Sequence, residues 1–184
     1  MIAHTHRLIQ RFARFARDHR AVTSIEFAIL LPLMLGLYLG SAEVSLGIAI
    51  KRKVTLTAHA VADLSTQYTA INNAQMNNIL NAASAIIAPY PSASLTATVS
   101  EISINAQGQA SVVWSDSLNG TALPVGQAVA VPAALAVPNT YLILGQAQYS
   151  YNPTYGYVLT STLTLSDQIF LLPRQSGSIA RTPS

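Results

Sequence analysis

The sequence contains no cysteine and little charge, and both absences narrow what the chain can be. Without cysteine, disulfides, thiol catalysis and cysteine-based metal sites are excluded. Charged residues make up 9% of the 184 residues and hydrophobic residues 51%, whereas roughly a quarter of a typical soluble protein is charged. A chain of this length has room for one modest domain and an appendage.

The basic residues are concentrated near the N-terminus. Eight of the ten lie between Arg7 and Lys53, and only Arg174 and Arg181 follow. Residues 54–184 therefore carry two basic and four acidic side chains, so the high pI describes the N-terminal region alone. We expect no nucleic-acid binding by the C-terminal part, because neutralising phosphates requires cations that it lacks.

Recognisable catalytic and metal-binding motifs are also missing. The four histidines do not form a ligand cluster, and the sequence has no Gly-x-Ser-x-Gly, phosphate-binding glycine loop or His-Glu-x-x-His. We therefore predict that the protein is not an enzyme, with no catalytic residue, no cofactor and no metal site. A tethered hydrolase would need a nucleophile and base that the sequence does not offer.

Residues 1–21 are predicted to form a basic cytoplasmic leader or flank. Arginines recur at helical spacing, with Leu8, Phe12 and Phe15 one step round the helix. This pattern indicates either an amphipathic helix on an anionic membrane surface or a disordered cationic segment. In both interpretations the N-terminus lies on the cytoplasmic side of the membrane.

A long apolar run follows, and residues 22–53 are predicted to form a transmembrane helix. No charged residue lies between Phe27 and Ala42, and the run stops at Lys51, Arg52 and Lys53. Five arginines precede the run and three basic residues follow it. The positive-inside rule therefore favours a single pass with the N-terminus in the cytoplasm.

Three residues of this region are candidates for contacts in the membrane. Glu26 stands at the entrance of the apolar run, where an ionised group is costly and often functional. The simpler interpretation is that it reaches the headgroups and pairs with Arg20. Gly36 and Gly40 form a Gly-x-x-x-Gly pair that favours close helix packing, although glycine is also common in membrane helices.

Residues 54–184 are predicted to form an extracytoplasmic α+β head. We expect one long helix from about Thr23 to Gln67 and a second, amphipathic helix over 72–88 that Pro89 ends. Alternation of apolar residues predicts a strand over 95–104, with a bulge near Ser100–Glu101 where the apolar phase changes.

The C-terminal half is expected to complete an antiparallel sheet. A glycine turn at 105–109 leads to a return strand, and a loop with a short helical turn at 131–135 follows. Further strands are predicted over 141–151 and 158–165, before a polar tail. Clustered tyrosines between Tyr141 and Tyr157 indicate either strand packing, which we favour, or a sticky contact surface.

The segment around Glu26 resembles the class III signal of type IV pilins and pseudopilins. In that family a small residue precedes the cleavage site and a glutamate lies five residues later. The resemblance implies that a prepilin peptidase cuts between Ala21 and Val22, and that Glu26 neutralises the new α-amino cation of a neighbouring subunit. Alanine stands here where the family usually has glycine.

More specifically, the N-terminal block resembles the TadE-like domain of the tight-adherence, Flp-type pilus machinery. The residues that carry the likeness are Ile25–Ala28, Pro32 and Glu43, and 59–67, "YSYNP" (149–153) and "LLPR" (171–174) are similar to TadE/TadG-like chains. The strong likeness covers about 50 residues at the N-terminal side.

This resemblance implies a pilus-assembly protein in a bacterial inner membrane, either a minor pseudopilin or an accessory factor of a type IV-related secretion system. Its partners would be the lipid bilayer, pilin subunits, other Tad assembly proteins and a prepilin peptidase. The alternative is a membrane-anchored periplasmic binding or adhesion module unrelated to pili, which needs the anchor but not Glu26.

Overall fold

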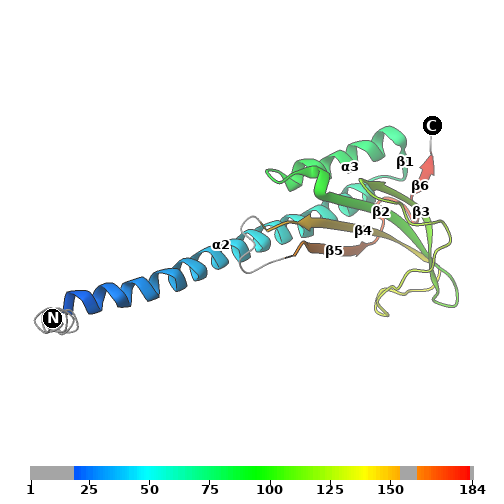
Figure 1. Ribbon diagram of the computed structural model, residues 1–184. Coiled ribbons are helices and arrows are strands. Elements are labelled where there is room, and N and C mark those ends of the chain that lie inside the picture. The colour runs from blue at the N-terminus through cyan, green and yellow to red at the C-terminus, as the bar shows by residue number, and fades with distance from the viewer. Residues whose placement is uncertain (1–18, 154–160, 183–184) are drawn as a thin grey trace, which may run out of the picture. The chain divides into compact units, whose positions relative to one another are not determined.

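The computed structural model describes residues 19–153 and 161–182 (Figure 1), so most of the predicted basic flank lies outside the described residues. The elements in chain order are α2 (His19–Thr66), β1 (Ala70–Asn72), α3 (Asn73–Ile87), η1 (Ser92–Ser94), β2 (Leu95–Ile104), β3 (Ala110–Leu118), β4 (Thr140–Tyr151), β5 (Leu163–Leu171) and β6 (Ala180–Thr182). This arrangement confirms the α+β prediction with a long N-terminal helix, a second helix and an antiparallel sheet.

The chain divides into two compact units. One comprises residues 1–44 with 154–160, and its described part is the first half of α2. The other comprises residues 45–153 with 161–184, and we refer to it as the C-terminal unit. It holds the sheet, α3 and the second half of α2.

The helix α2 is continuous over 48 residues, as the sequence predicted within a few residues at each end. At 1.5 Å per residue it is about 72 Å long. Pro32 lies inside it without ending it. The helix stops at Thr66, where the amides of Gln67 and Tyr68 bond to carbonyls only three residues back and tighten the last turn.

The second helix begins with a reciprocal cap. The Asn72 side chain accepts a hydrogen bond from the Gln75 amide, while the Gln75 side chain accepts one from the Asn72 amide, both at 2.9 Å. Two amides that the helix cannot satisfy are thereby paired. This cap explains why α3 starts at Asn73, close to the predicted residue 72.

The sheet has four strands in the order β3-β2-β4-β5, and every pair is antiparallel. The β2–β3 hairpin turns at Gly108, whose φ of 76° suits a residue without a side chain. This confirms the predicted hairpin and the strand that follows the loop.

One face of the sheet packs against the second half of α2. Val54, Ala58, Val61 and Ala62 are fully buried there. The approach is closest at Gly145 of β4, where an added Cβ would lie 2.5 Å from the Ala58 carbonyl oxygen. A glycine at this position therefore lets helix and strand come into contact.

The opposite face carries a second, smaller core. Its buried residues are Ile102, Ile104, Val112, Leu142 and Leu144, and Leu123, Val129, Val131 and Phe170 pack against them. The loop between β3 and β4 supplies three of those covering side chains. The sheet is thus apolar on both faces, but at different places along its strands.

This second core corrects the interpretation of the apolar phase change in β2. A bulge does occur between Glu101 and Ile102, but it belongs to β3, which inserts Val113. Pairing of β2 with β4 shows no shift. The strand therefore keeps alternating, and its phase changes because Leu95 to Val99 face the helices while Ile102 and Ile104 face the loop.

The C-terminal predictions need two further corrections. The last long strand was expected over 158–165 but runs from Leu163 to Leu171, and residues 154–160 lie outside the described part. The expected polar tail contains β6, which pairs in parallel with β1. Strands of three residues are too short to show a periodic pattern. The short helical turn predicted at 131–135 is present as two overlapping hydrogen-bonded turns, from Pro132 to Leu135 and from Ala133 to Ala136.

Candidate functional site

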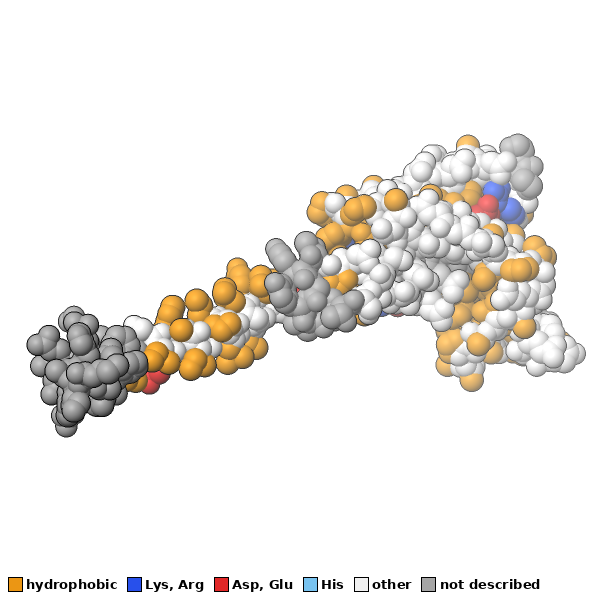
Figure 2. Space-filling model, viewed as in Figure 1, with side chains coloured by type: hydrophobic (Ala, Val, Ile, Leu, Met, Phe, Trp, Pro, Cys, Tyr) orange, Lys and Arg blue, Asp and Glu red, His pale blue; other side chains and the backbone are white. Residues whose placement is uncertain are grey.

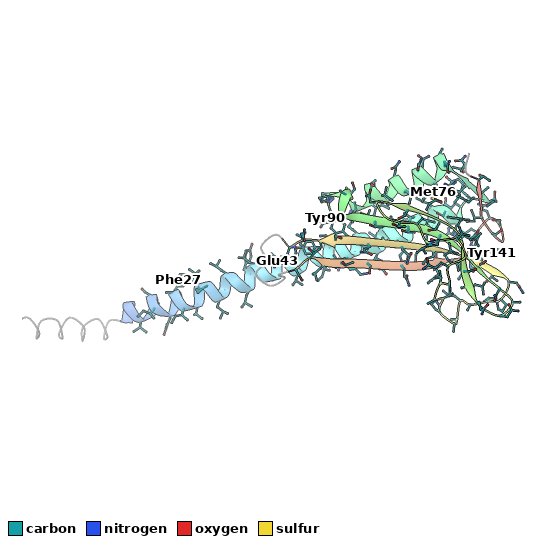
Figure 3. All side chains as sticks on the ribbon, turned by 45° about the vertical axis from the view of Figure 1, so that its right-hand side comes forward. Phe27, Glu43, Met76, Tyr90 and Tyr141 are labelled. Atoms are coloured by element: carbon teal, nitrogen blue, oxygen red, sulfur yellow. The ribbon has the colours of Figure 1, made fainter. Side chains whose placement is uncertain are left out.

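The first half of α2 presents large apolar side chains on all sides. Phe27, Leu33, Leu37 and Tyr38 are each at least 60% exposed. Figure 2 shows hydrophobic side chains along this part of the helix, and Figure 3 shows Phe27 on it. We call residues 22–38 the apolar segment. A helix that is hydrophobic all round requires either burial or a lipid environment.

The apolar segment lies within a candidate membrane span, Val22–Thr66, that the described residues contain. None of the most apolar stretch of eighteen residues in this span is buried. By length and composition the helix is able to cross a bilayer. This supports the predicted anchor.

The candidate processing and assembly residues lie at the start of α2. Val22 is 44% exposed, Glu26 is exposed, and the two lie one helical turn apart on the same side. The Ala21–Val22 bond lies within α2.

The two glycines of the Gly-x-x-x-Gly pair differ in their surroundings. An added Cβ at Gly36 would meet nothing within 4 Å, whereas Gly40 is buried. Glu43, one turn further on and labelled in Figure 3, is only 2% exposed. Gly36 is therefore the member of the pair that the described structure leaves open to a neighbouring helix.

The C-terminal unit contains a buried acid that the sequence did not single out. Glu101 of β2 is 2% exposed, and its carboxylate accepts a hydrogen bond of 2.6 Å from the Ile179 amide. Trp114 of β3 donates its indole N–H to the Ile179 carbonyl at 2.7 Å. Burial raises the pKa of Glu101, and its hydrogen bonds partly oppose this effect.

Arg181 fixes the same C-terminal segment two residues later. Its guanidinium donates to both carboxylate oxygens of Asp116, at 2.8 and 3.1 Å, and to the Asn73 side chain at 2.8 Å. This hydrogen bonding to Asp116 raises the pKa of Arg181. Residues 179–182 thus join β1 to the sheet, a role that no local pattern in a polar tail could indicate.

The tyrosines of β4 contribute mainly to packing. Tyr149 and Tyr151 are 4% and 3% exposed, and Tyr149 meets Tyr90 edge to face at 6.5 Å. Tyr141, at 36% exposure, is the more accessible member of this strand. Packing, the favoured interpretation, is confirmed for Tyr149 and Tyr151, while Tyr155 and Tyr157 lie outside the described residues.

Within residues 19–153 and 161–182, no three His, Asp or Glu side chains are grouped so as to hold a metal ion. The most unusual surface is the apolar segment with Glu26 at its start.

Comparison of the chain with known proteins gives a match within α2 and its apolar segment. Neither the curated proteins nor the solved structures contain a match to the chain. The likeness of residues 149–153 and 171–174 to TadE/TadG-like chains therefore stays a prediction. Residues 21–63 match the family model described as TadE-like protein, which confirms that the N-terminal half of this chain carries a TadE-like segment.

Proposed function

We propose that this protein is a non-enzymatic assembly component of a tight-adherence pilus system, as a minor pseudopilin or an accessory factor. The observation that carries the proposal is a coincidence of two features. The TadE-like match covers the part of α2 whose apolar side chains are exposed on all sides. A helix of this kind associates with lipid and with other apolar helices.

The proposed location is a bacterial inner membrane, crossed once with the N-terminus in the cytoplasm. The support is the charge asymmetry of the sequence, with more basic residues before the apolar run than after it. The C-terminal unit would then lie in the periplasm. Its partners would be pilin subunits or other Tad assembly proteins.

Glu26 is proposed to act between subunits. If a prepilin peptidase releases Val22 as a new N-terminus, its α-amino cation and Glu26 carry opposite charges at one end of the same apolar helix. In an apolar surround, each charge is costly unless a partner meets it. Pairing Glu26 of one subunit with the α-amino cation of the next would favour one packing register between their apolar helices and penalise the others.

The decisive experiment replaces Glu26 and measures filaments. Glu26→Ala should leave membrane insertion intact, because it makes the helix more apolar, but remove the protein from sheared pili or abolish piliation. Phe27→Leu is the matched control, since it changes the adjacent exposed residue while keeping it apolar, and should behave as wild type. Unchanged piliation in Glu26→Ala would contradict the proposal.

Mass spectrometry of the purified protein tests processing separately. A mature chain that starts at Val22 supports the pseudopilin form, whereas an intact Met1 favours an uncleaved accessory factor. Replacing residues 1–53 with an unrelated N-in anchor distinguishes the alternative function. A tethered binding or adhesion module would still work after this exchange, but a pilus subunit would not.

A further inference from the structure

A groove on the sheet face that turns away from α2 has no role in the proposed assembly function. The second core covers one part of this face, and the groove lies on the remaining part. Its volume is about 480 Å³, within the range typical of ligand sites. The polar side chains that line it include Thr96, Thr98, Thr121, Gln146, Gln148 and Gln168.

The wall of the groove is built by the loop after β3, which is fixed to the sheet. Ser100, fully buried, donates a hydrogen bond of 2.8 Å to the Ser115 hydroxyl, which also accepts the Leu123 amide at 3.0 Å. At Gly120 an added Cβ would lie 2.5 Å from Thr96 Cγ2. The loop therefore rests directly on β2, and the groove is formed before any ligand binds.

The floor consists of paired amides and hydroxyls. Gln146 of β4 donates to Gln168 of β5 at 3.1 Å, and Thr98 is 2.9 Å from the Ser117 hydroxyl across β2 and β3. A glutamine side chain has two N–H groups and one acceptor oxygen, so a single contact leaves it able to bond further. Neighbouring amides and hydroxyls suit a ligand whose groups both donate and accept.

Charge is almost absent from this site. The sequence has no charged residue from Ser117 to Ser166, which includes the loop and all of β4. Among the described residues of the lining, only Asp167 is charged, and its carboxylate is bonded to Thr55 and paired with Lys51 at 3.2 Å. Charged residues make up only 9% of the whole chain, so the groove shares the low charge of the molecule and presents mainly neutral polar groups.

These features exclude several ligand classes. Phosphates and nucleic acids need cations that the groove does not present. An apolar ligand would displace water from the remaining donors and acceptors of these glutamines and threonines without replacing its hydrogen bonds, which is unfavourable. A ligand rich in hydroxyls and without charge satisfies both conditions.

We propose that this groove binds a neutral oligosaccharide. The inference is independent of the proposed pilus function, because it depends only on residues of the C-terminal unit. The ligand's hydroxyls would exchange hydrogen bonds with the Gln146–Gln168 pair and with the threonines of β2. Since the lining residues that the structure describes include no aromatic ring for stacking, binding would be weak, with a Kd on the order of 1 mM.

The test uses the full chain in phospholipid nanodiscs, because many mild detergents carry sugar headgroups that would compete. Saturation-transfer NMR would measure binding of maltotriose and of chitotriose. Gln146→Leu and Gln168→Leu should each weaken binding about fivefold through loss of hydrogen bonds. Gln107→Leu, the same change on the exposed hairpin turn, should leave binding unchanged.

Thermal unfolding of each variant would verify that the C-terminal unit remains folded, and Gln146→Ala would replace any leucine variant that does not fold. The proposal is overturned if neither saccharide binds at roughly 10 mM, a concentration that would detect a millimolar Kd. It is also overturned if Gln107→Leu weakens binding as much as the two groove variants do.

Discussion

The two halves of α2 are both apolar, yet their surroundings are opposite. The apolar segment presents Leu, Ile, Phe and Met on every side, while in the second half Val54, Ala58, Val61 and Ala62 are completely buried. The second half has small residues in one stripe, which lets the sheet approach at Gly145. A single stripe needs one partner, whereas an all-round apolar surface needs an apolar solvent.

Polar residues in the two halves follow the same contrast. In the second half, Thr57, Ser65 and Thr66 are fully buried, but each hydroxyl donates to a carbonyl one turn back, at 2.7–2.8 Å. These bonds offset most of the cost of burial. In the first half, Glu26 is exposed, whereas Glu43 near the end of that half is only 2% exposed. The contrast therefore holds for the apolar segment, residues 22–38, whose side chains are exposed, and not for every residue of the first half.

The largest expected effect comes from placing the same polar side chain in each half. Val61→Asn should lower the free energy of unfolding of the C-terminal unit by about 3 kcal/mol, because it removes packing and buries an amide. Leu33→Asn should leave that unfolding unchanged and weaken membrane association. Denaturant unfolding and flotation with lipid vesicles measure the two effects. Equal destabilisation by both changes would remove the distinction between the halves.

Replacing Gly145 of β4 and Gly36 of α2 with alanine gives a second contrast, with a somewhat smaller expected effect on stability. Gly145→Ala should destabilise the C-terminal unit by about 2 kcal/mol, since the new Cβ would collide with the Ala58 carbonyl and Ala62. Gly36→Ala meets no atom within 4 Å and should leave unfolding unaltered. Thermal unfolding of the two variants tests this. Association of α2 with other helices, measured by cross-linking in membranes, should fall only in Gly36→Ala.

The buried Glu101 makes the stability of the C-terminal unit depend on pH. Because burial raises the folded pKa of Glu101 above its ordinary value of 4.5, the folded state holds the proton more tightly. Stability should therefore fall as pH rises from that value through the folded pKa, by at most about 1.4 kcal/mol per pH unit. Glu101→Gln should flatten this dependence in unfolding experiments. An unchanged pH profile in Glu101→Gln would contradict the role of burial.

The smallest effect concerns a partly exposed contact between α2 and β5. A hydrogen bond from Thr55 lowers the pKa of Asp167, with a further contribution from Lys51. The stabilisation is therefore present at neutral pH and is lost as pH falls through the lowered pKa. Asp167→Asn should cost about 0.5 kcal/mol at neutral pH, and less in high salt. A double-mutant cycle with Lys51→Ala measures the coupling, which should vanish in acid.

The sequence predicted most of the fold where periodic patterns were long. The bounds of α2 and α3, the β2–β3 hairpin and β4 follow from apolar spacing, proline and a glycine turn. The same reasoning gave the wrong cause for the phase change in β2, because alternation does not show that a strand is covered on both faces. It missed β1 and β6 because three residues hold no pattern.

The candidate site divides in the same way. Glu26, Val22, Gly36 and the apolar run could be proposed from order and spacing along one helix, and their roles stay predictions. The contacts of Glu101 and Arg181 were not, because their partners Ile179 and Asp116 lie 78 and 65 residues away. Such pairs arise only when strands are placed side by side.

The sequence by itself determined a long helix with an apolar first half, an acid at its entrance, and a weakly charged α+β region after it. These features depend on local spacing and composition, which act before any distant contact forms. Only the tertiary structure decided which half of α2 is covered, where Glu101 is buried, and how threonines and glutamines from three strands and a loop form one groove. Those outcomes require residues distant in sequence to be brought together, and burial is defined only once they meet.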